Sequence, residues 1–143
     1  MPTHRLAIFT LLIMKFIPLI LMLLLLAACQ EKKFDRFERE AYEYTVRNCP
    51  KQMDEITVLD SMVFHNDGSL DYKYYYTVQL DEDQHQALKD ILDDLKERTA
   101  KNVRNSIELK AMKEAGLNFV YIYRDAQSGK QVAKYTITKE EYE

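Results

Sequence analysis

The sequence has 143 residues, 47% hydrophobic and 30% charged, and this length suits a single globular domain. Residues 1–28 contain two basic and no acidic side chains, which leaves 18 basic and 23 acidic residues and a formal charge of −5 in the rest. Since phosphate backbones require clustered Lys and Arg, this acidic balance excludes nucleic acid as the expected partner.

The first element along the chain is an uncharged apolar run over residues 16–28, which follows Arg5 and Lys15. As a helix, 13 residues rise about 20 Å, which is short of a hydrocarbon core of roughly 30 Å. The basic start, the short apolar run and the small residues at its end predict a signal peptide rather than a membrane span. Because Met14 already begins a complete signal peptide, it is an alternative to Met1 as the translation start.

The end of this run, Leu26-Ala27-Ala28-Cys29, resembles the lipobox of bacterial lipoproteins. The resemblance covers four residues and implies that residues 1–28 are removed and that Cys29 is acylated, as with palmitate, on its sulfur. Gln30 stands where Asp would resemble an inner-membrane retention signal, so the resemblance favours the outer membrane. An ordinary cleaved signal or an uncleaved anchor remains as the alternative.

Residues 29–33 would then form the lipidated Cys and a short tether, and residues 34–143 a single domain. Apolar residues at helical spacing predict a helix over Phe34–Asn48, and Pro50 discourages its continuation. The segments Ile56–His65 and Ser69–Leu80 read as a β-hairpin, because the Asn66-Asp67-Gly68 sequence between them favours a turn.

Acidic residues at Asp81–Asp83 suit the beginning of the next helix. The stripe predicted to face the core of this helix consists of Leu88, Ile91, Leu92, Leu95 and Thr99. A shorter helix is expected over Ser106–Ala115, with Gly116 after its end. A second hairpin is predicted from Leu117–Arg124 and Gln131–Thr138, joined across Ser128-Gly129.

The predicted order is α-β-β-α-(α)-β-β, which indicates an α+β fold. The simplest arrangement is an antiparallel four-stranded sheet made of two hairpins, with the helices packed on one face.

Ten tyrosines are the most distinctive feature of the composition, and seven of them fall on predicted strands. Strand alternation places Tyr72, Tyr74 and Tyr76 on one face, where we expect them to pack against the helices. Tyr75 points the other way beside Lys73, so Lys73 and Tyr75, together with Tyr121, are predicted as partner-binding residues.

The candidate reactive groups are few. If Cys29 is lipidated, Cys49 is left unpaired as a buried inert thiol, half of an intermolecular disulfide or a nucleophile; otherwise a Cys29–Cys49 bridge is possible. A catalytic base for Cys49 would have to be His65 or His85, and no spacing links either to it. The Asp81–Asp83 acids and His85 gather metal-ligand types, but they lack an EF-hand or zinc-enzyme pattern, and helix capping explains them. We therefore predict no catalytic residue, metal or cofactor.

These observations favour a membrane-anchored lipoprotein of the bacterial cell envelope, with its domain facing the periplasm or the cell surface. A non-catalytic binding or accessory domain that recognises an envelope protein, peptide or glycan is the leading interpretation. A periplasmic inhibitor or immunity protein is the alternative, and a thiol- or metal-dependent enzyme is a third. The mature domain also resembles the uncharacterised exported lipoproteins of bacteria.

Overall fold

The computed structural model describes residues 33–143, and within them Phe37–Glu143 form one compact unit. The predicted signal peptide and Cys29 lie outside the described residues. Residues 33–48 form a helix, called here the N-terminal helix, which confirms the helix predicted before Pro50. No helix in the described part of the chain is long and apolar enough to cross a membrane.

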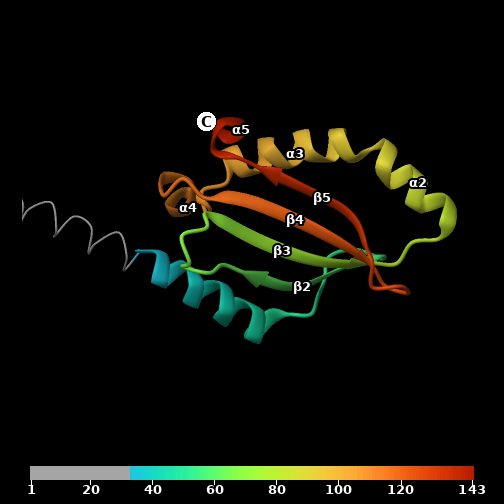
Figure 1. The fold of residues 1–143 in the computed structure, drawn as a ribbon, viewed down its shortest axis with the longest axis horizontal. Coiled ribbons are helices and arrows are strands. Elements are labelled where there is room, and N and C mark those ends of the chain that lie inside the picture. Colours follow the sequence, from blue (N-terminus) through green and yellow to red (C-terminus); the bar gives the residue numbers. More distant parts are fainter. Residues whose placement is uncertain (1–32) are drawn as a thin grey trace, which may run out of the picture. The chain divides into compact units, whose positions relative to one another are not determined.

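Five strands and four further helices follow the N-terminal helix (Figure 1). In chain order they are β1 (Lys51–Gln52), β2 (Thr57–Val63), β3 (Asp71–Val78), α2 (Glu82–Asp90), α3 (Leu92–Asn105), α4 (Lys110–Glu114), β4 (Asn118–Asp125), β5 (Gln131–Ile137) and α5 (Lys139–Tyr142). The strands form a single sheet in the order β1-β2-β3-β4-β5.

The prediction of a four-stranded antiparallel sheet is wrong in two respects. The sheet has a fifth strand, β1, and β3 pairs with β4 in parallel. Both predicted hairpins are present, because β2 pairs antiparallel with β3 and β4 with β5. The chain between β3 and β4 contains three helices, and a helical crossover of this length is what allows two strands to run in parallel.

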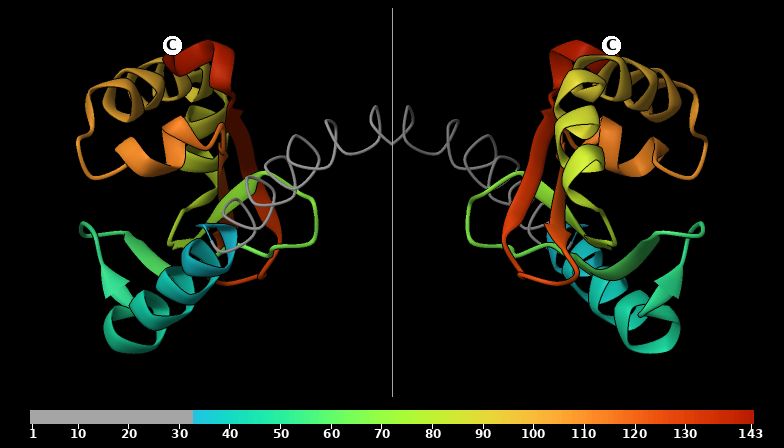
Figure 2. Two further views of the ribbon diagram at one scale, coloured as in Figure 1. Left: turned by 90° about the vertical axis from the view of Figure 1, so that its left-hand side faces the viewer. Right: turned by 90° about the vertical axis from the view of Figure 1, so that its right-hand side faces the viewer.

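Contacts place the long helices on the same face of the sheet, as predicted. The Thr45 hydroxyl of the N-terminal helix exchanges two hydrogen bonds, both 2.9 Å, with the backbone N–H and C=O of Met62 in β2. Near the opposite edge of the sheet, the Thr99 hydroxyl of α3 is 3.1 Å from the Tyr135 hydroxyl of β5. In Figure 2, α3 and α4 lie above and the N-terminal helix lies below, along separate margins of the sheet.

The core lies between this face and the helices. It combines Phe37 and Ala41 of the N-terminal helix with strand and loop residues that are almost fully buried, among them Tyr72, Leu117, Phe119 and Ile137. Val120 and Ile122 point to the other face and are also buried, because β4 lies between β3 and β5.

The observed ends of the helices match the capping signals in the sequence, but they do not match the single helix that the apolar stripe predicted. Asp81 caps α2 through a capping box with Gln84, as its acidic residues suggested. The predicted continuous helix is interrupted at Ile91, where α2 ends and α3 begins. The helix predicted over Ser106–Ala115 is shorter, and Gly116 follows it with a φ of 75°, a conformation that favours glycine.

Candidate functional site

A cluster of stacked tyrosines on the helix-bearing face is the most distinctive site in the described residues. Strands β3, β4 and β5 supply it because alternate residues of a strand share one face. It is called here the tyrosine ladder and consists of Tyr72, Tyr74, Tyr76, Tyr121, Tyr123 and Tyr135. The structure thus confirms that Tyr72, Tyr74 and Tyr76 share a face, but of the three only Tyr72 is fully buried, and Tyr74 and Tyr76 remain partly exposed.

The strand register aligns the rings across the sheet. Tyr74 pairs with Tyr121, and their ring centroids are 5.0 Å apart with planes inclined by 8°. Tyr76 pairs with Tyr123 at 4.9 Å, and Tyr121 stacks on Tyr135 at 5.1 Å. Rings at these separations attract one another beyond the area they bury, so each stack makes the surface more rigid.

The hydroxyl groups of five ladder tyrosines, all except Tyr72, divide into two sets. The Tyr135 hydroxyl lies 3.3 Å from that of Tyr123 and is also bonded to Thr99, so this end of the ladder is satisfied within the protein. Within residues 33–143, no hydrogen bond ends on the hydroxyls of Tyr74, Tyr76 or Tyr121. These three groups are therefore available to water or to a partner.

Burial raises the pKa of five phenols of the ladder, those of Tyr72, Tyr74, Tyr76, Tyr121 and Tyr123. It raises the pKa of Tyr76 to about 12, with smaller contributions from Tyr135, Tyr44 and Cys49. The pKa values of Tyr74 and Tyr121 are also raised, again mainly by burial. These five phenols therefore stay neutral at physiological pH, and their hydroxyls act as hydrogen-bond donors and acceptors rather than as bases.

The two long helices stand on either side of the ladder. The N-terminal helix packs along β2, and its Tyr44 contributes to the raised pKa of Tyr74, while α3 packs against β5. The central strands β3 and β4 lie between them and carry the partly exposed Tyr74, Tyr76, Tyr121 and Tyr123. The arrangement presents an aromatic surface flanked by two helices.

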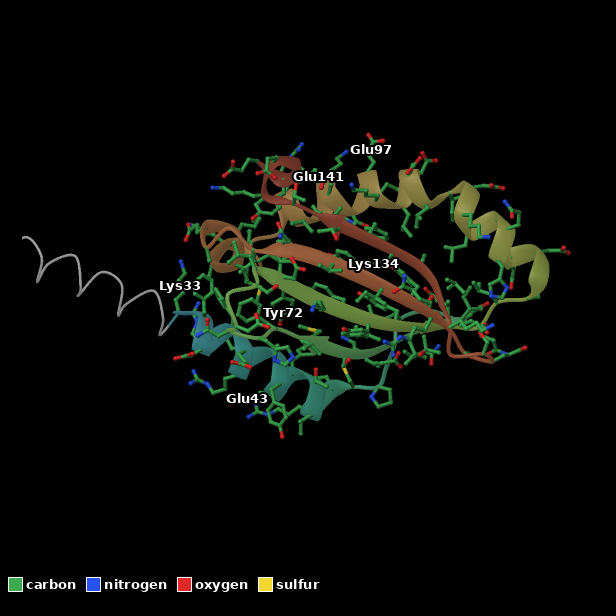
Figure 3. The ribbon with its side chains drawn as sticks, in the orientation of Figure 1. Lys33, Glu43, Tyr72, Glu97, Lys134 and Glu141 are labelled. Carbon is green, nitrogen blue, oxygen red and sulfur yellow. The ribbon has the colours of Figure 1, made fainter. Side chains whose placement is uncertain are left out.

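The structure separates the residues predicted to bind a partner. Lys73 and Tyr75 lie together on the open face of β3, where the Arg124 guanidinium stands 5.2 Å from the centre of the Tyr75 ring. Tyr121 lies on the opposite face, in the ladder. Figure 3 shows Tyr72 near the beginning of β3 beside the N-terminal helix, and Lys134 on β5. The importance of the whole ladder was missed, although the alternation of tyrosines in β3 was its visible signal.

Cys49 follows the N-terminal helix and is a free, partly buried thiol. Burial raises its pKa, the Asp60 carboxylate raises it further, and Lys51 opposes both effects. A raised pKa reduces the thiolate fraction, which is the nucleophilic form. These surroundings therefore do not activate Cys49 as a nucleophile.

Neither candidate base is placed to activate Cys49. His65 follows β2 and lies near the first turns of the N-terminal helix, where its Nδ1 is 3.2 Å from the Glu38 carboxylate. His85 faces the Asp81 carbonyl at 2.8 Å and lies 3.7 Å from the buried carboxylate of Asp125.

The acidic residues that begin α2 have a structural role, as the capping interpretation expected. Asp81 is the cap of α2, and the described residues contain no group of three or more His, Cys, Asp or Glu able to hold a metal ion. A broad hollow beside α3 and α5 is lined largely by charged side chains. There Lys96 forms an ion pair with Glu141 at 2.7 Å, and the Arg104 guanidinium donates to the Glu141 backbone carbonyl at 2.9 Å.

Comparison with known proteins places the chain among relatives. A family model described as a domain of unknown function, DUF8479, matches residues 32–133. The chain belongs to the DUF8479 family. The match begins beside the N-terminal helix and reaches β5, so this DUF8479 domain includes all members of the ladder except Tyr135. No curated protein matches the chain.

Solved structures share the fold of this DUF8479 protein. A candidate secreted protein from Pseudomonas aeruginosa is 12% identical, with a TM-score of 0.66, and the similarity covers 78% of this chain and 94% of that one. A type 2 secretion system pilotin from Vibrio vulnificus has a TM-score of 0.55 at 8% identity, over 80% and 94% of the two chains. The type II secretion system pilotin AspS from Vibrio cholerae has a TM-score of 0.57 at 11% identity, over 81% and 97%. At these identities the similarity shows the fold alone.

Proposed function

We propose that this protein is a lipid-anchored, non-catalytic accessory protein of the bacterial cell envelope that binds a protein partner over its tyrosine ladder. The observation that carries the proposal is the fold, which matches two pilotins over 94% and 97% of their own chains. Because folds host many functions, the argument from those pilotins is an analogy, and this chain's own residues must support it.

The anchor is the part of the proposal that rests on sequence. Cys29 ends a lipobox-like sequence, and only Gln30 to Lys32 separate it from the first described residue, Lys33. Two or three acyl chains on this cysteine hold a protein firmly, whereas one chain binds marginally. With Gln30 after the cysteine, the outer membrane is the proposed destination.

The ladder supports the binding role through its chemistry. Tyrosines are enriched at the centres of protein interfaces because they combine a large rigid ring with a polar tip. Here the rings are held in place by stacking before any partner arrives, so little conformational entropy is lost on binding. The unbonded hydroxyls of Tyr74, Tyr76 and Tyr121 give such a partner polar contacts within an apolar surface.

The open face is a second candidate surface, because Lys73 and Tyr75 were predicted there and Arg124 stacks on Tyr75. Tyr75 and Tyr76 are consecutive residues of the same type on opposite faces of β3. They therefore provide a matched pair of positions that distinguishes the two surfaces.

Photocrosslinking in cells tests the proposal. A photoreactive phenylalanine replaces Tyr76 in one strain and Tyr75 in another, and the adducts are identified by mass spectrometry. We expect a discrete protein adduct from position 76 and none of the same mass from position 75. An adduct from position 75 alone would move the binding surface to the open face. No adduct from either position would overturn the binding role.

A further inference from the structure

Ile107 is the most exposed of the large apolar side chains in the described residues, with 87% of its surface accessible. Others of this kind range from 41% for Ile56 to 69% for Tyr42. Single exposed apolar residues are common, so exposure alone does not argue for a binding role. The position of Ile107 in the fold adds the further evidence.

The side chain of Ile107 has no role in holding its own turn together. Ile107 lies between α3 and α4, where the Leu109 N–H donates to the Ser106 hydroxyl at 3.3 Å. The Ile107 carbonyl accepts from the Lys110 N–H at 3.1 Å. Neither bond involves the side chain of Ile107, which is exposed to solvent, so substitutions at this position should not disturb the fold.

Ile107 lies at the end of the sheet where β3 and β4 begin. The Met112 carbonyl in α4 accepts from Leu117, and the next residue, Asn118, donates to the Leu70 carbonyl at 2.8 Å. Leu70 is itself 42% exposed at this end. The left view of Figure 2 faces this end and shows α4 and the loop before β3.

The N-terminal helix begins at the same end. Phe37 packs edge-on against Phe64 with ring centroids 6.3 Å apart, and Phe64 directly follows β2. Only eight residues lead back from Phe37 to Cys29, and at about 3.5 Å per residue they span at most about 28 Å. If Cys29 is lipidated, this end of the domain is therefore the one that the chain keeps near the bilayer.

We propose that Ile107, with Leu70 at the same end, inserts into the membrane interface and orients the domain on the bilayer. This inference rests on the lipid anchor of the proposed function. One apolar side chain on a turn is small for a protein interface, which buries about 800 Å² on each partner. A bilayer requires no matching surface, because an apolar group gains on entering the acyl boundary wherever it meets it.

The chain contains no tryptophan, so an introduced indole is a unique reporter. Ile107→Trp is the test variant, and Met53→Trp is the matched control. Met53 is 49% exposed and donates to the Thr57 carbonyl at the start of β2, so it lies at the opposite end of the sheet. Each lipidated variant is reconstituted in phosphatidylethanolamine–phosphatidylglycerol vesicles, with and without brominated acyl chains, after circular dichroism confirms the fold.

Brominated chains should quench the Ile107→Trp emission by about twofold or more and leave the Met53→Trp emission nearly unchanged, because only the former enters the acyl boundary. Vesicle flotation of the unsubstituted protein separates the two proposals. Protein that floats while Ile107→Trp stays unquenched, or is quenched no more than Met53→Trp, overturns the insertion and leaves the anchor standing. Protein that does not float overturns the anchor and the insertion with it.

Discussion

Thr45→Val tests the attachment of the N-terminal helix to the sheet. The Thr45 hydroxyl both donates to and accepts from the backbone of Met62, at 2.9 Å in each direction. β1 pairs with β2 only at Val58 and Leu59. At Met62 no strand of the described part of the chain pairs with this edge of β2, so the Thr45 hydroxyl supplies the hydrogen-bond partners of the Met62 backbone. Valine keeps the shape of the side chain and removes both hydrogen bonds.

Each of these hydrogen bonds contributes about 1 kcal/mol net, and their loss leaves a partly buried N–H and C=O without a protein partner. Thr45→Val should therefore lower the free energy of unfolding by about 2 kcal/mol, a large share of a typical 5–15 kcal/mol. In urea denaturation followed by circular dichroism, the midpoint should fall by about 1 M or more.

Thr45→Ser is the control, because it keeps the hydroxyl and removes one methyl group. It should lose no more than about 1 kcal/mol. If Thr45→Val is as stable as the unsubstituted protein, or if the serine variant loses as much as the valine variant, the hydroxyl does not hold the helix to β2.

Three further substitutions test separate parts of the chain. Tyr135→Phe removes the hydroxyl bonded to Thr99 and should lower the free energy of unfolding, measured in urea, by about 1 kcal/mol. Hydrogen bonds from the Ser128 hydroxyl and N–H lower the pKa of Asp125, so its contribution to stability is present above about pH 4 and lost as the pH falls through the lowered pKa. Asp125→Asn should therefore make stability fall less steeply with acid, as measured by urea midpoints between pH 6 and about pH 2. Cys29→Ser should leave the precursor unprocessed and free of labelled fatty acid.

For each of these predictions, one result would contradict it. Unchanged stability in Tyr135→Phe would mean that water replaces the lost bond at no cost. An acid profile for Asp125→Asn that parallels that of the unsubstituted protein would remove Asp125 from the acid response. Fatty-acid labelling that persists in Cys29→Ser would disprove the anchor.

The elements of the fold were largely visible in the sequence, because each has a local signal. Alternation identified β3, turn residues identified both hairpins, and Pro50 marked the end of the N-terminal helix. The Thr138-to-Glu141 capping box of α5 was an equally local signal that went unused. The two-residue β1 could not be found this way, since its pairing to β2 is set by the chain's return from the helix.

The pairing of β3 with β4 required information that no single segment contains. Two hairpins can join through either edge and in either direction, and the sequence pattern within each strand is the same in all cases. The deciding feature was the chain between Val78 and Asn118, whose helices carry it back along the sheet to begin a parallel strand.

The candidate site depended on that same pairing. Alternation alone placed Tyr74 and Tyr76 on one face of β3, as the structure confirms. It could not show which face of β4 would join them. With β4 parallel to β3, Tyr121 and Tyr123 stack on them, and Tyr121 is separated from Lys73.

The affinity of the partner crosslinked at position 76 tests the central claim most directly. Titration calorimetry should show that Tyr76→Ala weakens the dissociation constant about tenfold or more, a loss typical of an interface centre. Tyr76→Phe keeps the ring stack and should retain most of the affinity. Tyr75→Ala, on the other face of the same strand, should change it less than about twofold. Weaker binding in Tyr75→Ala with unchanged binding in Tyr76→Ala would contradict a partner site on the tyrosine ladder.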